Sequence, residues 1–494
     1  KIWTNGTDPY VWLHLDKEEL YPVLEKDYTQ KLWIKNILML LLIDGGAVVA
    51  FVFRKKVLTL PIELLQNRKL IMNLAKNDFK TKYAGSYLGI VWAFVQPIVT
   101  ILVYWFVFSV GLKAGNVGAY DFMRSKIQSL EITPGQLGLE PCTGSLVATD
   151  PNTGEVLACV SYPGYDNNRL ANTVDADYFA SLNTDLSKPL YNYATQERTA
   201  PGSTFKMVSS VAGLATGVIT LTTQIMDKGV YENISNHPRC WALNHGYTHG
   251  LINVSEALRD SCNYFFYDVG YRLATNNFST SYDDATGISK IQEYASLLGL
   301  DETTGVEIEE NDPQIADEYP VMATIGQSNN NFTTISLSRY VTAVASGKLY
   351  DYKLMNKIVD ADGKTVKQYD SKSTDISGTL TQSQWDAIHQ GMRMVVEDLH
   401  DVFGGFTGVE VSGKTGTAQQ VETRPSHALF VGYAPSSNPE ITIATRISSG
   451  YSSHNAAAAS RNIISYYYNL ESLDNLLAVK AEGVNSSGSN AITD

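Results

Sequence analysis

The sequence PGSTFK, residues 201–206, opens an apolar run that continues to Ala215. The proline and glycine before this run mark a helix start, and we expect a helix from Ser203 to about Thr216. Residues three apart share one helix face, so Ser203 and Lys206 are predicted neighbours at a helix N-terminus. A serine becomes a nucleophile beside a base, which a lysine amine can be, and the helix N-terminus favours developing negative charge. Taken alone, this S-x-x-K pattern also fits an ordinary helix start.

Two further motifs strengthen the prediction of a serine enzyme. Ser261-Cys262-Asn263 is an S-x-N triplet between two helical patterns, and Lys414-Thr415-Gly416-Thr417 is a K-T-G motif with β-prone flanks. The order S-x-x-K, S-x-N, K-T-G is typical of penicillin-binding proteins and class A β-lactamases. All three motifs therefore point to acyl transfer through Ser203.

Residues 144–470 resemble the transpeptidase domain of class B penicillin-binding proteins. Beyond the three motifs, the likeness is carried by GSLVATDPNTGEVLACVSYPGYDNN (144–168), YNYATQERTAPGSTFK (191–206), INVSEALRDSCNYFFYDVG (252–270), ATIGQSNNNFTTISLSRYVTAVASG (323–347) and HALFVGYAP (427–435). The pedestal domain expected upstream in class B members is mostly absent, and no acidic motif of a glycosyltransferase domain precedes the segment.

The resemblance implies a catalytic role for each residue of the first two motifs. Ser203 would attack the peptide carbonyl and become acylated, while Lys206 takes its proton. Ser261 would relay a proton to the leaving D-alanine nitrogen. Asn263 would donate to the substrate amide or orient Lys206.

The resemblance also implies how the third motif binds substrate. Lys414 would supply positive charge facing the substrate carboxylate, and the hydroxyls of Thr415 and Thr417 would donate to it. Gly416 would keep the strand surface clear for the substrate. The backbone N–H groups of Ser203 and Thr417 would form the oxyanion hole.

Strand and helix patterns predict an α+β fold. Two β-rich runs, 145–150 and 155–162, flank a turn-forming Pro-Asn-Thr-Gly and predict a hairpin. Three successive strands are predicted late in the chain, and the predicted helices between include one opened by a capping-box spacing of Asn253 and Glu256. We therefore expect an antiparallel sheet with flanking helices and a helical subdomain, of the serine β-lactamase and penicillin-binding type. The late strands are expected within 409–420, 427–435 and 440–447, with a final helix over 454–470.

The N-terminal region predicts one or two membrane-spanning helices. Apolar stretches occupy 37–53 and 83–112, and between them the loop 54–82 carries eight Lys and Arg residues against two acidic ones. The positive-inside rule places this loop in the cytoplasm and the later domain outside. Residues 61–116 also resemble the N-terminal part of a polysaccharide ABC-transporter permease, which suggests a fused or chimeric chain.

These patterns divide the chain into five parts. They are an N-terminal segment of unknown role (1–36), a membrane region (37–121), a linker (122–143), the transpeptidase domain (144–470) and a flexible tail (471–494).

Composition and cysteine spacing exclude several other classes. The net charge is −13, which argues against nucleic acid as a partner. The four cysteines form no C-x-x-C pair, and we expect thiols rather than disulfides. A loop holding His237, Cys240, His245 and His249 could suggest zinc, but the resemblance covers this loop without a metal. We therefore expect no metal and no cofactor.

The favoured function is a D,D-transpeptidase of the bacterial cell membrane, with its catalytic domain outside the cytoplasm. Its partners would be peptidoglycan stem peptides, β-lactams and the membrane, with other cell-wall synthesis proteins as further candidates. Three alternatives stay open. The first is a β-lactam-binding sensor or inactive domain. The second is a β-lactamase, although no E-x-x-L-N segment supplies the carboxylate that deacylation requires. The third is a transporter subunit, although the further membrane spans of a transporter are missing.

Overall fold

The computed structural model describes residues 2–3, 12–13, 68–69, 119–129, 132–137, 141–418 and 424–478. The chain divides into two units, residues 1–126 and 127–494. The described part of the first unit holds the paired strands β1 (Ile2–Trp3) and β2 (Trp12–Leu13), two helical residues at 68–69 and most of helix α5 (Ala119–Gln128).

The predicted membrane region falls almost wholly outside this description. The two apolar stretches, the basic loop and the permease-like segment lie outside the described residues, apart from 68–69. Among the residues that are described, none of the helices combines the length and the apolar character needed to cross a bilayer.

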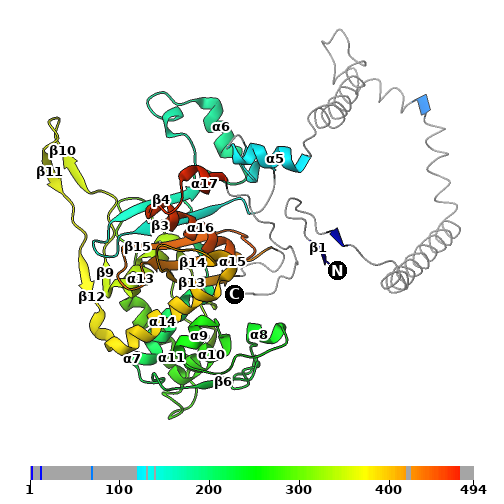
Figure 1. The fold of residues 1–494 in the computed structure, drawn as a ribbon, viewed down its shortest axis with the longest axis vertical. Coiled ribbons are helices and arrows are strands. Elements are labelled where there is room, and N and C mark those ends of the chain that lie inside the picture. The colour runs from blue at the N-terminus through cyan, green and yellow to red at the C-terminus, as the bar shows by residue number, and fades with distance from the viewer. Residues whose placement is uncertain are drawn as a thin grey trace, which may run out of the picture. The chain divides into compact units, whose positions relative to one another are not determined.

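A five-stranded antiparallel sheet forms the centre of the second unit (Figure 1). Its order is β13-β14-β15-β3-β4. The hairpin prediction is confirmed, because β3 (Gly144–Thr149) pairs with β4 (Val156–Tyr162), and β3 then pairs with the last strand, β15 (Ile441–Ile447). The sheet thus joins the two ends of the domain and leaves β13 (Ser412–Ala418) as one edge strand.

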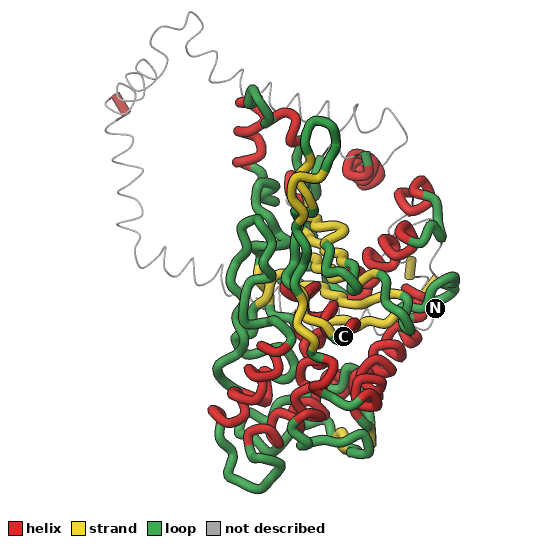
Figure 2. The backbone as a smooth tube through the Cα atoms, turned by 90° about the vertical axis from the view of Figure 1, so that its left-hand side faces the viewer, coloured by secondary structure: helices red, strands yellow, loops and turns green. Residues whose placement is uncertain are grey.

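The sheet is covered by helices on both faces (Figure 2). Along β14 (His427–Ala434), Leu429 and Val431 belong to the core that includes residues of α13 (Thr334–Ser346). The alternate residue Phe430 belongs to the core that includes residues of α16 (Ser453–Tyr467). Successive strand side chains point to opposite faces, so a strand buried on both sides is apolar at both sets of positions.

A helical subdomain lies beside the sheet and carries the first two motifs. Helices α7 (Lys206–Ala215), α10 (Asn263–Ala274) and α11 (Asp284–Leu297) share one apolar core. Helix α9 (Val254–Arg259) begins with the predicted capping box between Asn253 and Glu256. The α+β prediction, with its antiparallel sheet and helical subdomain, is confirmed.

Two helices lie at predicted domain boundaries. Helix α5 runs across the expected junction at residue 121, and helix α17 (Leu473–Ala478) occupies the start of the expected flexible tail.

The remaining elements are η2 (Gly135–Leu137), η3 (Asn167–Arg169), α6 (Ala176–Thr184), β5 (Arg198–Thr199), η4 (Gly202–Phe205), β6 (Ile225–Asp227), α8 (Trp241–Asn244), β7 (Gly250–Ile252), α12 (Pro320–Ala323), β8 (Phe332–Thr333), β9 (Lys348–Tyr350), β10 (Lys357–Val359), β11 (Thr365–Gln368), β12 (Ser373–Asp375), η5 (Ser377–Thr379), α14 (Gln382–Asp398) and α15 (His400–Phe403).

Candidate active site

Ser203 lies in the short 3-10 helix η4, which leads directly into α7. The residue before it, Gly202, has φ +51, and a Cβ there would lie 2.5 Å from the carbonyl oxygen of Thr417. A Cβ on Gly326 would lie 2.0 Å from the carbonyl oxygen of Gly202. Only glycine tolerates both the left-handed conformation and this close approach of backbones. The two glycines therefore hold the turn that presents Ser203 against β13.

Lys206 sits at the centre of the site and is fully buried. Its Nζ lies 2.9 Å from Oγ of Ser203 and 3.0 Å from Oγ of Ser261. It donates to the backbone carbonyl of Ser261 at 2.6 Å and to Oδ1 of Asn263 at 2.7 Å. The predicted grouping of Ser203, Lys206, Ser261 and Asn263 is therefore present.

The four oxygens around Nζ of Lys206 also suit a neutral amine, the form that can act as a base. The two nearest, the carbonyl of Ser261 and Oδ1 of Asn263, can only accept hydrogen bonds. A neutral amine donates its two N–H groups to them and turns its lone pair toward the hydroxyls. In that arrangement the lone pair can accept the proton of Ser203.

Ser261 links the two lysines of the site. It has φ +49, an uncommon value for a residue other than glycine, in the turn between α9 and α10. Its Oγ accepts from Nζ of Lys414 at 3.0 Å while also lying 3.0 Å from Nζ of Lys206. Its carbonyl accepts a further hydrogen bond from the indole of Trp241 at 3.1 Å. One hydroxyl thus stands between two amines, a position from which it can pass a proton.

The third motif lies on the edge strand β13, opposite the S-x-N turn. Lys414, Thr415 and Thr417 are all buried, and Nζ of Lys414 lies 3.4 Å from Oγ1 of Thr415. A Cβ on Gly416 would lie 2.7 Å from Cγ2 of Thr204 and 2.9 Å from the carbonyl oxygen of Pro201, so this glycine lets the turn that carries Ser203 pack closely against β13.

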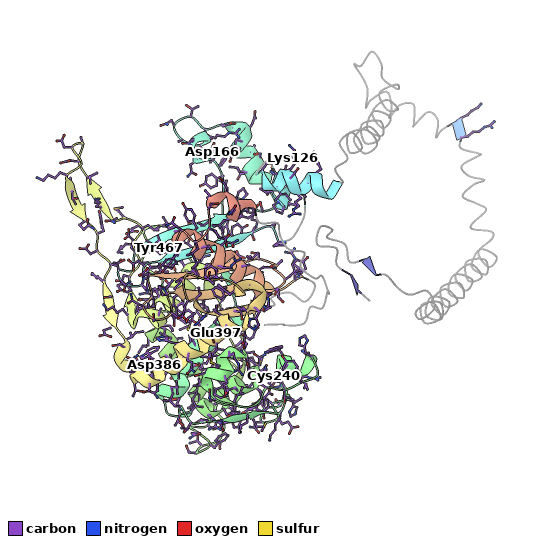
Figure 3. The ribbon with its side chains drawn as sticks, in the orientation of Figure 1. Lys126, Asp166, Cys240, Asp386, Glu397 and Tyr467 are labelled. Atoms are coloured by element: carbon purple, nitrogen blue, oxygen red, sulfur yellow. The ribbon has the colours of Figure 1, made fainter. Side chains whose placement is uncertain are left out.

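A second cluster adjoins the S-x-N turn, in the part of the chain where Figure 3 labels Cys240. Asp227, Cys240, His249 and Cys262 each place one donor atom within 4.8 Å of the others. Sγ of Cys240 lies 3.9 Å from Sγ of Cys262 and 3.5 Å from Nδ1 of His249, and Sγ of Cys262 lies 3.6 Å from Oδ2 of Asp227. Zinc bonds of about 2.3 Å to sulfur and about 2.0 Å to nitrogen or oxygen separate tetrahedral ligand atoms by about 3.3–3.8 Å. These four side chains could therefore hold a zinc ion.

Protonation within the cluster is strongly coupled. Burial opposes ionisation of Asp227, but hydrogen bonds from His249 and from Gly229 outweigh it and lower the pKa of this carboxyl to about 2. For His249, burial by itself would lower the pKa, because it disfavours the charged imidazolium. Hydrogen bonds with Asp227 and Cys240 outweigh burial and raise the pKa to about 9. The hydrogen bond from Cys262 lowers the pKa of the Cys240 thiol, while burial raises that of Cys262. A thiolate is therefore favoured at Cys240, which is the form that binds metals.

The sequence prediction missed this cluster. It considered Cys240 and His249 together with His237 and His245, which are not part of the cluster, and expected no metal site. Asp227 stands 13 residues before Cys240, and Cys262 was assigned only to the middle of the S-x-N motif. The signal in the sequence that could have revealed the cluster is Cys262, a thiol in the middle of the S-x-N motif. As predicted, all four cysteines of the chain are thiols rather than disulfides.

Comparison with known proteins agrees with this geometry. Residues 144–465 match the family described as "Penicillin binding protein transpeptidase domain". The chain is 28% identical over 367 residues to peptidoglycan D,D-transpeptidase MrdA of Haemophilus influenzae, covering 66% of this chain and 53% of that protein. It spans about half the length of the first curated relatives it matches.

Two solved structures have the same fold. Penicillin-binding protein 2 of Pseudomonas aeruginosa, in complex with WCK 5153, superposes with a TM-score of 0.56 at 28% identity, over 69% of this chain and 76% of that chain. A ceftriaxone acyl-enzyme of penicillin-binding protein A from Mycobacterium tuberculosis superposes with a TM-score of 0.59 at 23% identity, over 70% of this chain and 78% of that chain. At 23% identity, the likeness to penicillin-binding protein A concerns the fold alone.

Proposed function

Because the chain belongs to the penicillin-binding protein transpeptidase family through residues 144–465, we propose that it is a serine D,D-transpeptidase that cross-links peptidoglycan stem peptides and is acylated by β-lactams. One observation carries the proposal. The buried amine of Lys206 lies 2.9 Å from Oγ of Ser203 while two carbonyl-type oxygens occupy its N–H groups. This arrangement suits removal of the serine proton.

Acylation would follow from these contacts. Oγ of Ser203 attacks the carbonyl carbon of the terminal D-Ala-D-Ala bond as its proton passes to Nζ of Lys206. The bond from that carbon to the terminal D-alanine nitrogen breaks, and the proton travels from Lys206 through Ser261 to the leaving nitrogen. The backbone N–H groups of Ser203 and Thr417 would stabilise the oxyanion, a role supported by the close approach of the Thr417 backbone to Gly202.

Recognition of the substrate carboxylate would fall to Lys414, Thr415 and Thr417 on β13. Lys414 is held near the relay by its hydrogen bond to Oγ of Ser261. The same positive charge would therefore bind the carboxylate and favour the hydroxyl orientation in which Ser261 can donate onward. Charge-assisted hydrogen bonds of this kind contribute about 1.5–3 kcal/mol each.

Location and partners extend the same proposal. The catalytic domain would lie outside the cytoplasm and be anchored through residues 37–121, where the stem peptides of the cell wall are accessible. A β-lactam would occupy the donor site. Its leaving group stays tethered after ring opening and would block the incoming amine, so the acyl-enzyme would persist.

The test is covalent labelling of the whole chain with fluorescent penicillin, followed by intact mass and peptide mapping. We expect one label per chain, on Ser203, and persistence for many minutes after excess drug is removed. Ser203→Ala should abolish labelling, whereas the matched change of the exposed Ser279→Ala should leave it unchanged. A label on another residue would contradict the assignment, and turnover of many drug molecules per second would identify a β-lactamase.

A further inference from the structure

A row of residues crosses the central sheet beneath the segment that leads to Ser203. The strand register pairs each member of the row with the next, and the members on β13, β14, β15, β3 and β4 are Gly416, Leu429, Arg446, Ser145 and Ser161. Residues directly opposite each other on antiparallel strands share one face of the sheet. Leu429 belongs to the core that includes residues of α13, so the whole row lies on the face that α13 covers.

The segment 191–204 follows this row from one edge of the sheet to the other. On β4, Oγ of Ser161 donates a hydrogen bond to Oδ1 of Asn192 at 2.8 Å. On β13, a Cβ added to Gly416 would lie 2.7 Å from Cγ2 of Thr204, so these two residues are in close contact. Contacts with the row therefore fix both ends of the segment to the sheet.

Arg446 holds the middle of the segment through a buried ion pair. Its side chain is 1% exposed, and its Nη2 lies 3.2 Å from Oε1 of Glu197, whose side chain is 34% exposed. Its Nε and Nη1 have no hydrogen-bond partner among the residues that the structure describes. A guanidinium stays charged in proteins, and a buried charge needs an ionic partner to offset the loss of its hydration. The carboxylate of Glu197 is therefore needed where it stands.

A short stretch of chain, itself held in place, connects Glu197 to Ser203. Residues 198–199 form β5, which pairs with β8, and the backbone φ of Pro201 is −73°. The proline ring restricts φ to values near this one, so the stretch has little freedom to absorb a shift. A displacement of Glu197 would therefore reach Ser203. Misplacing a reacting group by about 1 Å can slow a reaction about 10²-fold.

From these contacts we propose that Arg446 and Glu197 are positioning residues for acylation, because their ion pair holds Ser203 where its Oγ meets the substrate carbonyl. Both act through the backbone of 197–203 and not on the reacting atoms. They should set the rate of the chemical step and not the affinity for a β-lactam, since its carboxylate would be bound on β13. The inference rests on the proposed acylation of Ser203 and assigns to it two residues that lie outside the three motifs.

The experiment separates the rate of acylation from binding. Stopped-flow labelling of the whole chain with fluorescent penicillin gives the limiting acylation rate and the dissociation constant of the complex that precedes it. Rates are counted per chain that becomes labelled, so unfolded protein does not contribute. The variants are Glu197→Gln, which removes the charge, and Glu197→Asp, which keeps it. The matched control is Glu471→Gln, because Glu471 is 36% exposed and lies 3.5 Å from Arg461, away from the segment 191–204.

We expect Glu197→Gln to lower the limiting rate about 10-fold and to leave the dissociation constant within about twofold of the unmodified chain. Glu197→Asp should keep at least about a third of the original rate, because the charge that compensates the guanidinium remains. The control should match the unmodified chain. Adding Arg446→Gln to Glu197→Gln should slow acylation by no more than about twofold further, since both changes remove the same ion pair.

An unchanged limiting rate in Glu197→Gln would overturn the inference, as would a loss confined to drug affinity. A purely structural role would lower the melting temperature and the labelled fraction but would not change the rate per labelled chain. A Glu197→Asp variant as slow as Glu197→Gln would also overturn the inference, because the charge would then not matter. The Glu197 variants decide the outcome even when the double variant does not fold. Failure of penicillin to label Ser203 in the unmodified chain would instead refute the proposed function.

Discussion

At the scale of single residues, Lys206 determines what the site can do. It is fully buried, yet four oxygens lie within 3.0 Å of its Nζ, and the amine of Lys414 reaches the same hydroxyl of Ser261. Two ammonium groups sharing one hydroxyl would repel each other strongly in a buried site. The arrangement therefore favours one neutral amine and one ammonium. In the proposed reaction Lys206 is the neutral amine and Lys414 the ammonium.

Removing this amine should stop acylation without removing the site. We expect Lys206→Ala to slow acylation by penicillin at least 100-fold, because a positioned base contributes about 10²–10⁴-fold to rate. Stopped-flow measurement of acylation, together with circular dichroism to verify folding, checks this. Lys372→Ala, an exposed lysine, is the control. Acylation of the Lys206 variant at near the original rate would mean that another group removes the serine proton.

His427 predicts a pH dependence of stability. Burial, with the nearby charge of Arg446, lowers its pKa to about 4, against about 6.5 in an unfolded chain. Between these values the unfolded state binds the extra proton and the folded state does not, so stability falls as pH falls from 6.5 to 4. At neutral pH the folded state keeps an accepted hydrogen bond from the backbone N–H of Ser449 to Nδ1 at 3.1 Å.

Replacing this imidazole should reduce the loss of stability at low pH. We expect His427→Gln to lose less unfolding free energy than the unmodified chain between pH 7 and pH 4.5, by on the order of 2 kcal/mol. Urea unfolding at several pH values measures it, with the exposed His400→Gln as the control that should keep the original slope. Superimposable pH profiles for the His427 variant and the unmodified chain would show that the imidazole does not contribute.

At the scale of elements, the turn between α9 and α10 connects two sites. It presents Ser261 to Lys206 and Lys414, and Cys262 to the cluster with Asp227, Cys240 and His249. Residues this close in the chain cannot move independently. Whatever fixes the cluster therefore also fixes the position of the catalytic hydroxyl.

This coupling predicts an effect of metal removal. We expect the chain purified without chelator to hold one zinc ion, and its loss by dialysis against chelator to lower the melting temperature and slow acylation by penicillin together. Metal analysis, thermal unfolding and a cobalt-substituted absorption spectrum with thiolate bands would measure this. Cys262→Ser should lose the metal, whereas Cys159→Ser, a thiol outside the cluster, should keep it. A metal-free preparation with full stability and activity would contradict the prediction.

At the scale of the whole molecule, the sheet makes the catalytic domain depend on segments far apart in sequence. Strand β3 pairs with β15, so the hairpin at the start of the domain completes the sheet whose other edge carries Lys414. The S-x-x-K turn is then held between that edge and the helical subdomain. The active site is therefore assembled from three distant regions and forms only when the whole domain folds.

The predicted membrane region, residues 37–121, leads to a prediction about the whole molecule. The loop 54–82 contains eight basic residues and only two acidic ones, so we expect this loop inside the cell and the catalytic domain outside. A single cysteine placed at Asn73 should be protected from a membrane-impermeant maleimide in intact cells, whereas one placed at Ser279 should be labelled. Labelling of the native cysteines is measured in parallel as the background. Protection at Ser279 in intact cells would contradict an external catalytic domain.

The sequence by itself determined the grouping of the motif side chains and most of the elements. Helical spacing placed Lys206 beside Ser203, the turn signals predicted the first hairpin, and the three motifs predicted which side chains would meet. These are local rules of backbone geometry, joined to a combination of motifs typical of one kind of enzyme. They required no knowledge of how distant segments pack.

Only the tertiary structure decided which distant side chains share a space. It packed Thr204 closely against Gly416, and it brought Asp227 to Cys262 across 35 residues. It also formed a cleft that leads from Thr415 to Asp398. Such contacts depend on the relative placement of whole helices and strands, which is set by the shared core and not by the spacing of residues along the chain.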